Sequence, residues 1–75
     1  MITDFGNVKI GAKVFEDVPI ERDWFDRPIK RETKICEVTR LVPSGKASVW
    51  VTFRTPEGYS YATLKRITTK CMEVA

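Results

Sequence analysis

The chain has 75 residues, of which 43% are hydrophobic and 31% are charged. This length leaves no room for a second core, and the composition is typical of a globular protein rather than a disordered one. The formal net charge of +3 is a modest basic excess that does not by itself predict a polyanionic partner. The sequence has no apolar run of about 18 residues and no secretory signal at its start, so we expect a cytoplasmic protein without a membrane partner.

Residue types exclude several kinds of chemistry. The chain has no His and two Cys, Cys36 and Cys71. Without His, neither a Ser–His nor a Cys–His catalytic pair can form, and the Cys spacing fits no zinc site. No glycine-rich phosphate-binding loop is present. We therefore predict a protein that is not an enzyme, that holds no metal or cofactor, and whose two thiols are reduced.

The first half of the chain predicts two strands and a long connection. Residues 8–15 (VKIGAKVF) alternate in polarity, which predicts a half-buried strand with Gly11 at a bend or bulge. Residues 16–31 contain two prolines and predict a long loop that folds back over the domain. Residues 33–42 (TKICEVTRLV) are rich in β-branched residues and predict a second strand, with a bulge near Thr39–Arg40.

The second half alternates strand and turn signals. PSGK at 43–46 predicts a turn, and ASVWVTFR at 47–54 predicts a strand that buries Val49, Val51 and Phe53 while Trp50 faces outward. The chain then continues through a tight turn at 55–58 (TPEG), a strand at 59–64 (YSYATL), one helical turn at 64–67 and a last strand at 69–74.

This order of elements resembles the SH3-like small barrels. The resemblance is topological and runs from Val8 to Val74. It implies an all-β, five-stranded, partly open barrel, with residues 1–75 as a single domain, a long loop after the first strand and one 3₁₀ turn before the fifth. An OB-fold is the main competitor, but it normally has a helix between its third and fourth strands, where this sequence has a tight turn.

A local similarity goes further. TPEGY at 55–59 and LKRI at 64–67 are similar to segments of the plasmid-encoded type II dihydrofolate reductases, which are also SH3-like barrels. The Val-Gln-Ile-Tyr motif that lines the folate pore of that family is absent, and this chain contains no Gln. The similarity therefore implies shared hairpin chemistry, and no active-site residue is carried over.

Two aromatic features suggest a binding surface. In ERDWFDRPIK at 21–30, we expect one of Trp24 and Phe25 to be buried as an anchor and the other exposed, with no preference between them. An outward Trp50 would have Glu37, Thr39 or Arg40 of the second strand and Tyr59 and Tyr61 of the fourth strand as neighbours. The alternative is that Trp50 packs under the long loop.

Two functional hypotheses follow. The first is a non-catalytic protein-binding module that docks on a larger protein, as small His-free chains of phages and mobile elements commonly do. Its partner-binding residues would be Asp23, Trp24, Phe25, Asp26, Trp50, Arg54, Tyr59 and Tyr61. The alternative is a nucleic-acid-binding barrel that uses the basic residues Lys34, Arg40, Lys46, Arg54, Lys65 and Arg66. A homo-oligomer is left open, because small barrels with outward aromatic residues often pair.

Overall fold

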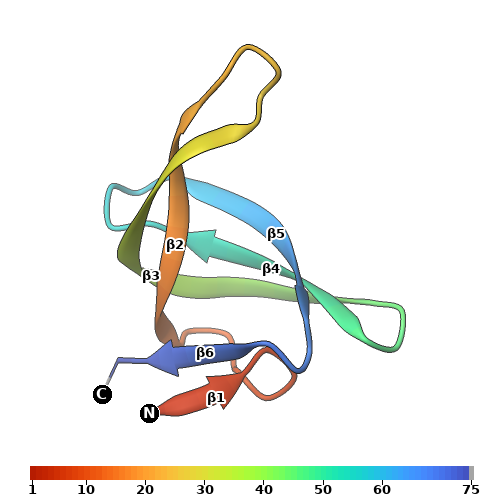
Figure 1. Ribbon diagram of the computed structural model, residues 1–75. Helices are drawn as coiled ribbons and strands as arrows, with labels where there is room; N and C mark the ends of the chain where they lie inside the picture. The colour runs from red at the N-terminus through yellow and green to blue at the C-terminus, as the bar shows by residue number, and fades with distance from the viewer. Residues whose placement is uncertain (75) are drawn as a thin grey trace.

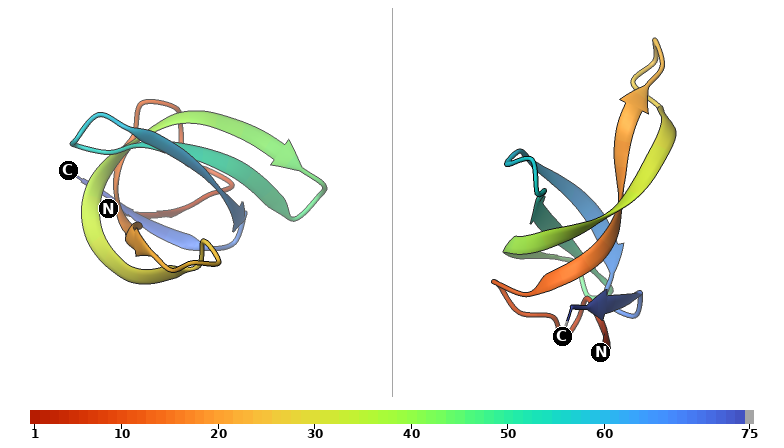
Figure 2. Two further views of the ribbon diagram at one scale, coloured as in Figure 1. Left: turned by 90° about the horizontal axis from the view of Figure 1, so that it is seen from above. Right: turned by 90° about the vertical axis from the view of Figure 1, so that its left-hand side faces the viewer.

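The computed structural model describes residues 1–74 as an all-β protein with six strands (Figure 1). The strands are β1 (Ile2–Asp4), β2 (Lys13–Arg22), β3 (Pro28–Ser44), β4 (Ser48–Arg54), β5 (Ser60–Arg66) and β6 (Lys70–Glu73). They form one antiparallel sheet in the order β1-β6-β2-β3-β4-β5. Viewed from above, the sheet curls around a common interior as a half-barrel (Figure 2). The all-β prediction is confirmed, and the predicted number of five strands is wrong.

The main correction concerns residues 8–31. The predicted strand at 8–15 starts only at Lys13, and β2 then runs through most of the predicted loop to Arg22. β3 begins at Pro28, so the segment is a β-hairpin with its turn at 23–27 instead of a loop lying on the sheet. This hairpin rises above the rest of the molecule (Figure 1).

Two predicted irregularities are confirmed. The pairing of β3 with β4 shifts between Val38 and Arg40, which is the expected bulge and turns the half-buried Leu41 toward the core. Gly11 has a φ of 94°, and its N–H donates to the carbonyl of Val38 at 2.7 Å, while the carbonyl of Ala12 accepts from the Val38 N–H at 2.8 Å. Gly11 and Ala12 thus lie opposite the single residue Val38, which is a β-bulge, and Gly11 provides the positive φ that this bulge requires.

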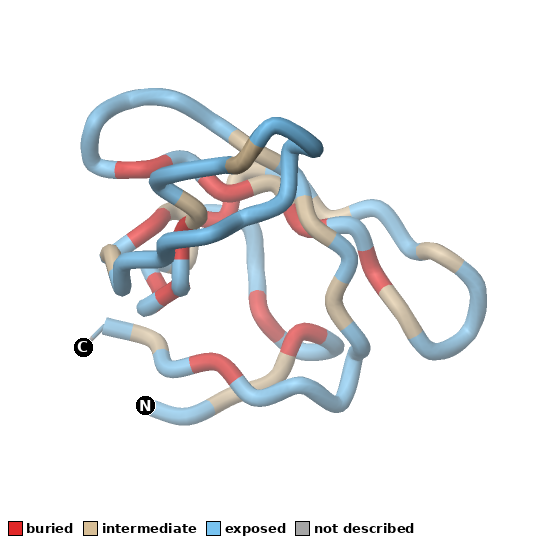
Figure 3. The backbone as a smooth tube through the Cα atoms, turned by 45° about the horizontal axis from the view of Figure 1, so that its top comes forward, coloured by how far each residue is buried: buried red, intermediate tan, exposed pale blue. Residues whose placement is uncertain are grey.

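The core lies inside the curl and is centred on Phe53, which is fully buried. The centre of its ring lies 6.1 Å from the centre of the Phe5 ring, in an edge-to-face arrangement, and 5.7 Å from the centre of the Tyr61 ring. Figure 3 shows the buried positions as short segments separated by exposed ones along the strands. The buried hydrophobic residues are Phe5, Val8, Val14, Val18, Cys36, Val38, Val49, Val51, Phe53 and Cys71.

The end of the chain differs from the prediction at one point. The predicted 3₁₀ turn at 64–67 is wrong, because β5 continues to Arg66, which pairs with Ser48 of β4. The last strand, β6, pairs with Val14 and Phe15 of β2. It also pairs with β1, a three-residue strand that the sequence did not predict.

A polar cluster spans the interior. Glu16 of β2 is buried, and its Oε2 lies 3.0 Å from Nζ of Lys65 on β5. The hydroxyl of Tyr61, also on β5, donates to the same carboxylate at 3.3 Å. Since β3 and β4 separate β2 from β5 in the sheet, these side chains connect strands that share no backbone hydrogen bonds. We call Glu16, Tyr61 and Lys65 the clasp.

Candidate functional site

The tip of the β2–β3 hairpin is an ordered turn. The N–H of Asp26 donates to the carbonyl of Asp23 at 3.0 Å, and the N–H of Asp23 donates to the carbonyl of Arg27 at 3.0 Å. Asp26 has a φ of 60°. A four-residue turn whose last residue is left-handed is a common way to close a β-hairpin. We call residues 23–27 the tip.

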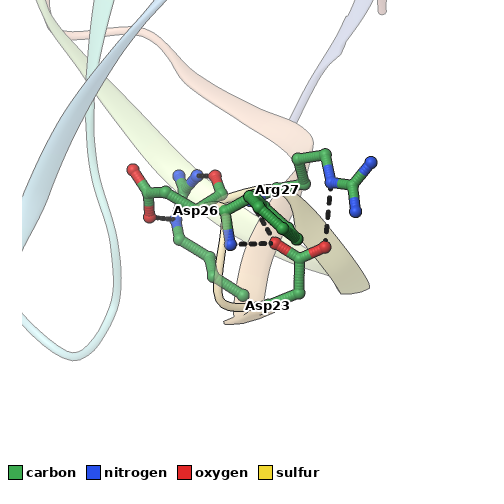
Figure 4. Close-up of polar contacts among 5 residues, drawn as sticks. Asp23, Asp26 and Arg27 are labelled. Carbon is green, nitrogen blue, oxygen red and sulfur yellow. Dashed lines mark hydrogen bonds and ion pairs between the residues drawn. The ribbon is translucent and has the colours of Figure 1, made fainter.

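The side chain of Asp23 fixes the tip. Its Oδ1 accepts hydrogen bonds from the backbone N–H groups of Phe25 and Arg27, both at 2.9 Å, and its Oδ2 accepts from Nε of Arg27 at 2.9 Å (Figure 4). The backbone hydrogen bond from Arg27 is the main cause that lowers the pKa of the Asp23 carboxyl below its usual value. The carboxylate therefore stays ionised at neutral pH and holds the turn in one conformation.

Both aromatic rings of the tip face solvent. Trp24 is 101% exposed and Phe25 is 78% exposed, so the prediction that one ring is a buried anchor is wrong. The guanidinium carbon of Arg27 lies 5.0 Å from the centre of the Phe25 ring, which places a cation over one face of that ring. Trp24 is the most exposed large hydrophobic side chain among the described residues.

The charges of the tip are matched in pairs. Arg27 lies 2.9 Å from the Asp23 carboxylate, and Nε of Arg22 lies 3.6 Å from the Asp26 carboxylate. Arg22 also donates to the carbonyl of Asp26 at 3.0 Å. Two carboxylates and two guanidinium groups thus surround the rings without leaving a net charge.

Trp50 faces outward from β4, as predicted, and is 45% exposed. Its predicted neighbours are wrong, because the register places Val42 and Leu64 directly opposite Trp50. Tyr61 pairs with Phe53 and points inward to the clasp, where burial raises the pKa of its hydroxyl. Tyr59 is exposed beside the turn at 55–58. Trp50 does not pack under the long loop either, since that segment is the raised hairpin.

The predicted basic residues separate into two groups. Lys34 forms an ion pair with Glu57, which raises the pKa of Lys34 and lowers that of Glu57, and Lys65 is held in the clasp. The other four are exposed and form no ion pair within the described part of the chain: Arg40, Lys46, Arg54 and Arg66.

The structure therefore provides two separate surfaces in place of one. Asp23, Trp24, Phe25 and Asp26 lie together at the tip, whereas Trp50 and Arg54 lie on the outward side of β4. Sequence reasoning missed Val42 and Leu64 as neighbours of Trp50. The predicted turn at 43–46 is displaced, because the turn lies at 45–47, and the resulting Ser44–Ser48 pair sets the register that brings Val42 to Trp50.

Other functional groups are scarce. Cys36 and Cys71 are free and buried, and burial raises the pKa of both thiols. Within residues 1–74, no group of three or more His, Cys, Asp or Glu side chains is placed to hold a metal ion. No helix in the same residues is long and apolar enough to cross a membrane.

Comparison with family models, with curated proteins and with solved structures found no match to this chain.

Proposed function

We propose that this chain is a small, non-catalytic protein-binding module whose tip docks on a larger protein. The observation that carries the proposal is the full exposure of Trp24 on an ordered turn. Trp is the residue type most enriched among the residues that dominate binding energy at protein interfaces, and water contact with such a large apolar ring is unfavourable. A ring held in this position gains stability when a partner covers it.

The order of the tip supports binding as well. Three hydrogen bonds to Asp23 and two backbone hydrogen bonds across the turn fix the conformation before any partner arrives. A pre-organised loop loses little conformational entropy on binding, so more of the contact energy appears as affinity. The docking of phage or mobile-element proteins on host proteins is the biological setting that we propose for this module.

The shape and charge of the tip indicate the kind of pocket that it fits. The hairpin rises clear of the half-barrel, as the right-hand view of Figure 2 shows, so it reaches into a recess without a clash from the rest of the chain. Asp23, Asp26 and Arg27 leave the tip with one negative charge, which the adjacent Arg22 offsets, so the complementary pocket is apolar and uncharged at its base. Phe25 has one face covered by Arg27, so Trp24 is the ring that enters deepest.

The test is capture from the lysate of the natural host, followed by measured affinity for the protein that is identified. We expect Trp24→Ala to weaken binding by more than about 30-fold, as for a hot-spot residue of about 2 kcal/mol or more, and Phe25→Ala to weaken it less. Binding should survive nuclease treatment and high salt. Ile10→Ala is the matched control, because Ile10 is 63% exposed and lies outside the hairpin.

Three results would contradict the proposal. One is equal affinity of the parent and Trp24→Ala for every captured protein. Another is loss of capture on nuclease treatment, which would indicate a nucleic-acid bridge. The third is insertion of Trp24 into neutral lipid vesicles, seen as a blue shift of its fluorescence, with no protein partner retained.

A further inference from the structure

The outward side of β3, β4 and β5 combines an apolar row with unpaired arginine residues. Val42, Trp50 and Leu64 lie directly opposite one another across the three strands, and each is exposed. The rows on either side contain Arg40, which pairs with Thr52, and Arg66, which pairs with Ser48. A row is a set of directly opposite residues on β3, β4 and β5. The four rows that contain Arg66, Trp50, Arg40 and Arg54 form the surface that we call the arginine face.

Charge on the arginine face is predominantly positive. Arg40, Arg54 and Arg66 form no ion pair within the described residues. The one carboxylate in these rows belongs to Glu37, which stands opposite Arg54 on β3. Three guanidinium groups against one carboxylate give the face a local excess of two positive charges. The acidic residues of the chain lie mainly on the hairpin and in the clasp.

Spacing places the arginine residues around the indole. Successive outward residues on a strand lie about 7 Å apart, and neighbouring strands lie about 4.8 Å apart. Arg40 and Arg66 therefore flank Trp50 one row away on opposite sides, and Arg54 extends the charge by another row. A flat ring with cations on both sides fits a ligand that has planar groups joined by regularly spaced anions.

We propose that the arginine face binds single-stranded nucleic acid, with one base stacked on Trp50 and phosphates held by Arg40, Arg54 and Arg66. Stacking on an indole needs an unpaired base, so the face favours a single strand over a duplex. Val42 and Leu64 provide apolar edges for the neighbouring sugars and bases. This inference is independent of the proposed function, because the tip contributes none of these residues.

A second copy of the chain is a poorer occupant. A symmetric pair formed through this face would bring the same three arginine residues of each copy toward one another. Like charges in direct opposition destabilise a sheet contact, and Glu37 is the one carboxylate in each copy available to offset three arginine residues. An acidic protein remains as the competing ligand, which the experiment includes.

The experiment titrates the Trp24→Phe variant with a single-stranded oligothymidylate of about 20 nucleotides while the fluorescence of Trp50 is recorded. We expect quenching on binding. Contacts to three phosphates predict that the logarithm of the association constant falls with the logarithm of salt concentration with a slope of about −2. Arg40→Gln and Arg66→Gln should each reduce this slope by about 0.7. Trp50→Ala, followed by fluorescence anisotropy of a labelled oligonucleotide, should weaken binding by about 5- to 150-fold.

Arg31→Gln is the matched control, because it removes an exposed arginine of β3 outside these rows. It should leave the slope unchanged. The inference is overturned by absence of binding at low salt, by a flat salt dependence, or by equal effects of Arg31→Gln and Arg40→Gln. Equal affinity for polyglutamate, or a concentration-dependent dimer that Trp50→Ala dissociates, would also overturn it. The Arg→Gln variants keep the test valid if Trp50→Ala fails to fold.

Discussion

Asp26 is the one residue other than glycine with a positive φ among the described residues. The left-handed conformation is unfavourable for residues with a Cβ atom, although Asp tolerates it better than most. The chain retains a carboxylate here, where glycine would relieve the conformation. Its ion pair with Arg22, at 3.6 Å and largely exposed, contributes little stability. The local conformation of this residue is therefore suboptimal.

Asp26→Gly should raise the free energy of unfolding of the hairpin by about 0.5–1 kcal/mol, because glycine adopts this φ without strain. The measurement is amide hydrogen exchange at Asp23 and residue 26, whose N–H groups close the turn. Asp26→Ala is the control, because it removes the same carboxylate and the same ion pair without adding conformational freedom. It should accelerate exchange. Slower exchange in both variants would show that the carboxylate, and not φ, limits the turn.

At the level of elements, the hairpin shows why sequence periodicity failed. Beyond Val18 and Glu32, residues 19–31 have no buried side chain on either face. A strand pair without a buried face has no reason to alternate in polarity, so its sequence looks like a loop. Inside the barrel, the alternation of β2 was hidden by Glu16, a charged residue on the inward face. Residues 19–22 and 28–31 are strands because their backbones pair with each other, and this pairing leaves no pattern in the sequence.

Elements with one buried face were predictable. The alternation of β4, the bulge in β3 and the turn at 55–58 follow from side-chain patterns and turn residues, and the N–H of Gly58 indeed donates to the carbonyl of Thr55 at 2.9 Å. The predicted helical turn failed because pairing with β4 outweighed the helix propensity of Leu64–Arg66. β1 is three residues long and pairs with the opposite end of the chain, so no local window reveals it. For the candidate site, the residues of the tip were predicted but their shared exposure was not.

Removal of the upper hairpin tests whether it belongs to the core. The change replaces residues 19–31 with Asn-Gly, which joins Val18 to Glu32 by a two-residue turn suited to a hairpin. We expect a cooperative thermal unfolding transition to remain, because no buried side chain is lost. Partner capture should be lost, and binding of oligothymidylate should remain. Loss of cooperative unfolding would mean that the hairpin stabilises the half-barrel and is not only a binding element.

At the scale of the whole molecule, the curl depends on contacts between strands that are distant in the sheet. A domain of this size has a total stability of about 4–11 kcal/mol, so single buried interactions matter. The N–H of Gly6, which follows β1, donates to the carbonyl of Ile67, which follows β5, at 3.0 Å, and so connects the two edges of the sheet. Across the interior, the clasp performs the same role with side chains. Lys65 also lies 5.4 Å from the centre of the Phe5 ring, so the clasp adjoins the aromatic core.

The clasp predicts strong coupling between Glu16 and Lys65. Glu16→Leu should lower the free energy of unfolding by about 1–3 kcal/mol, because the ammonium group of Lys65 loses its carboxylate while its side chain remains only 23% exposed. Adding Lys65→Met should restore stability to within about 1 kcal/mol of the parent, since an apolar pair of similar size avoids the burial of charge. Denaturant unfolding of the two single variants and the double variant measures the coupling. Tyr61→Phe is the control, which removes one hydrogen bond and should cost about 0.5–1.5 kcal/mol. Additive effects of the two substitutions would mean that β2 and β5 are held together by apolar packing alone, and that the charged pair is incidental to the curl of the sheet.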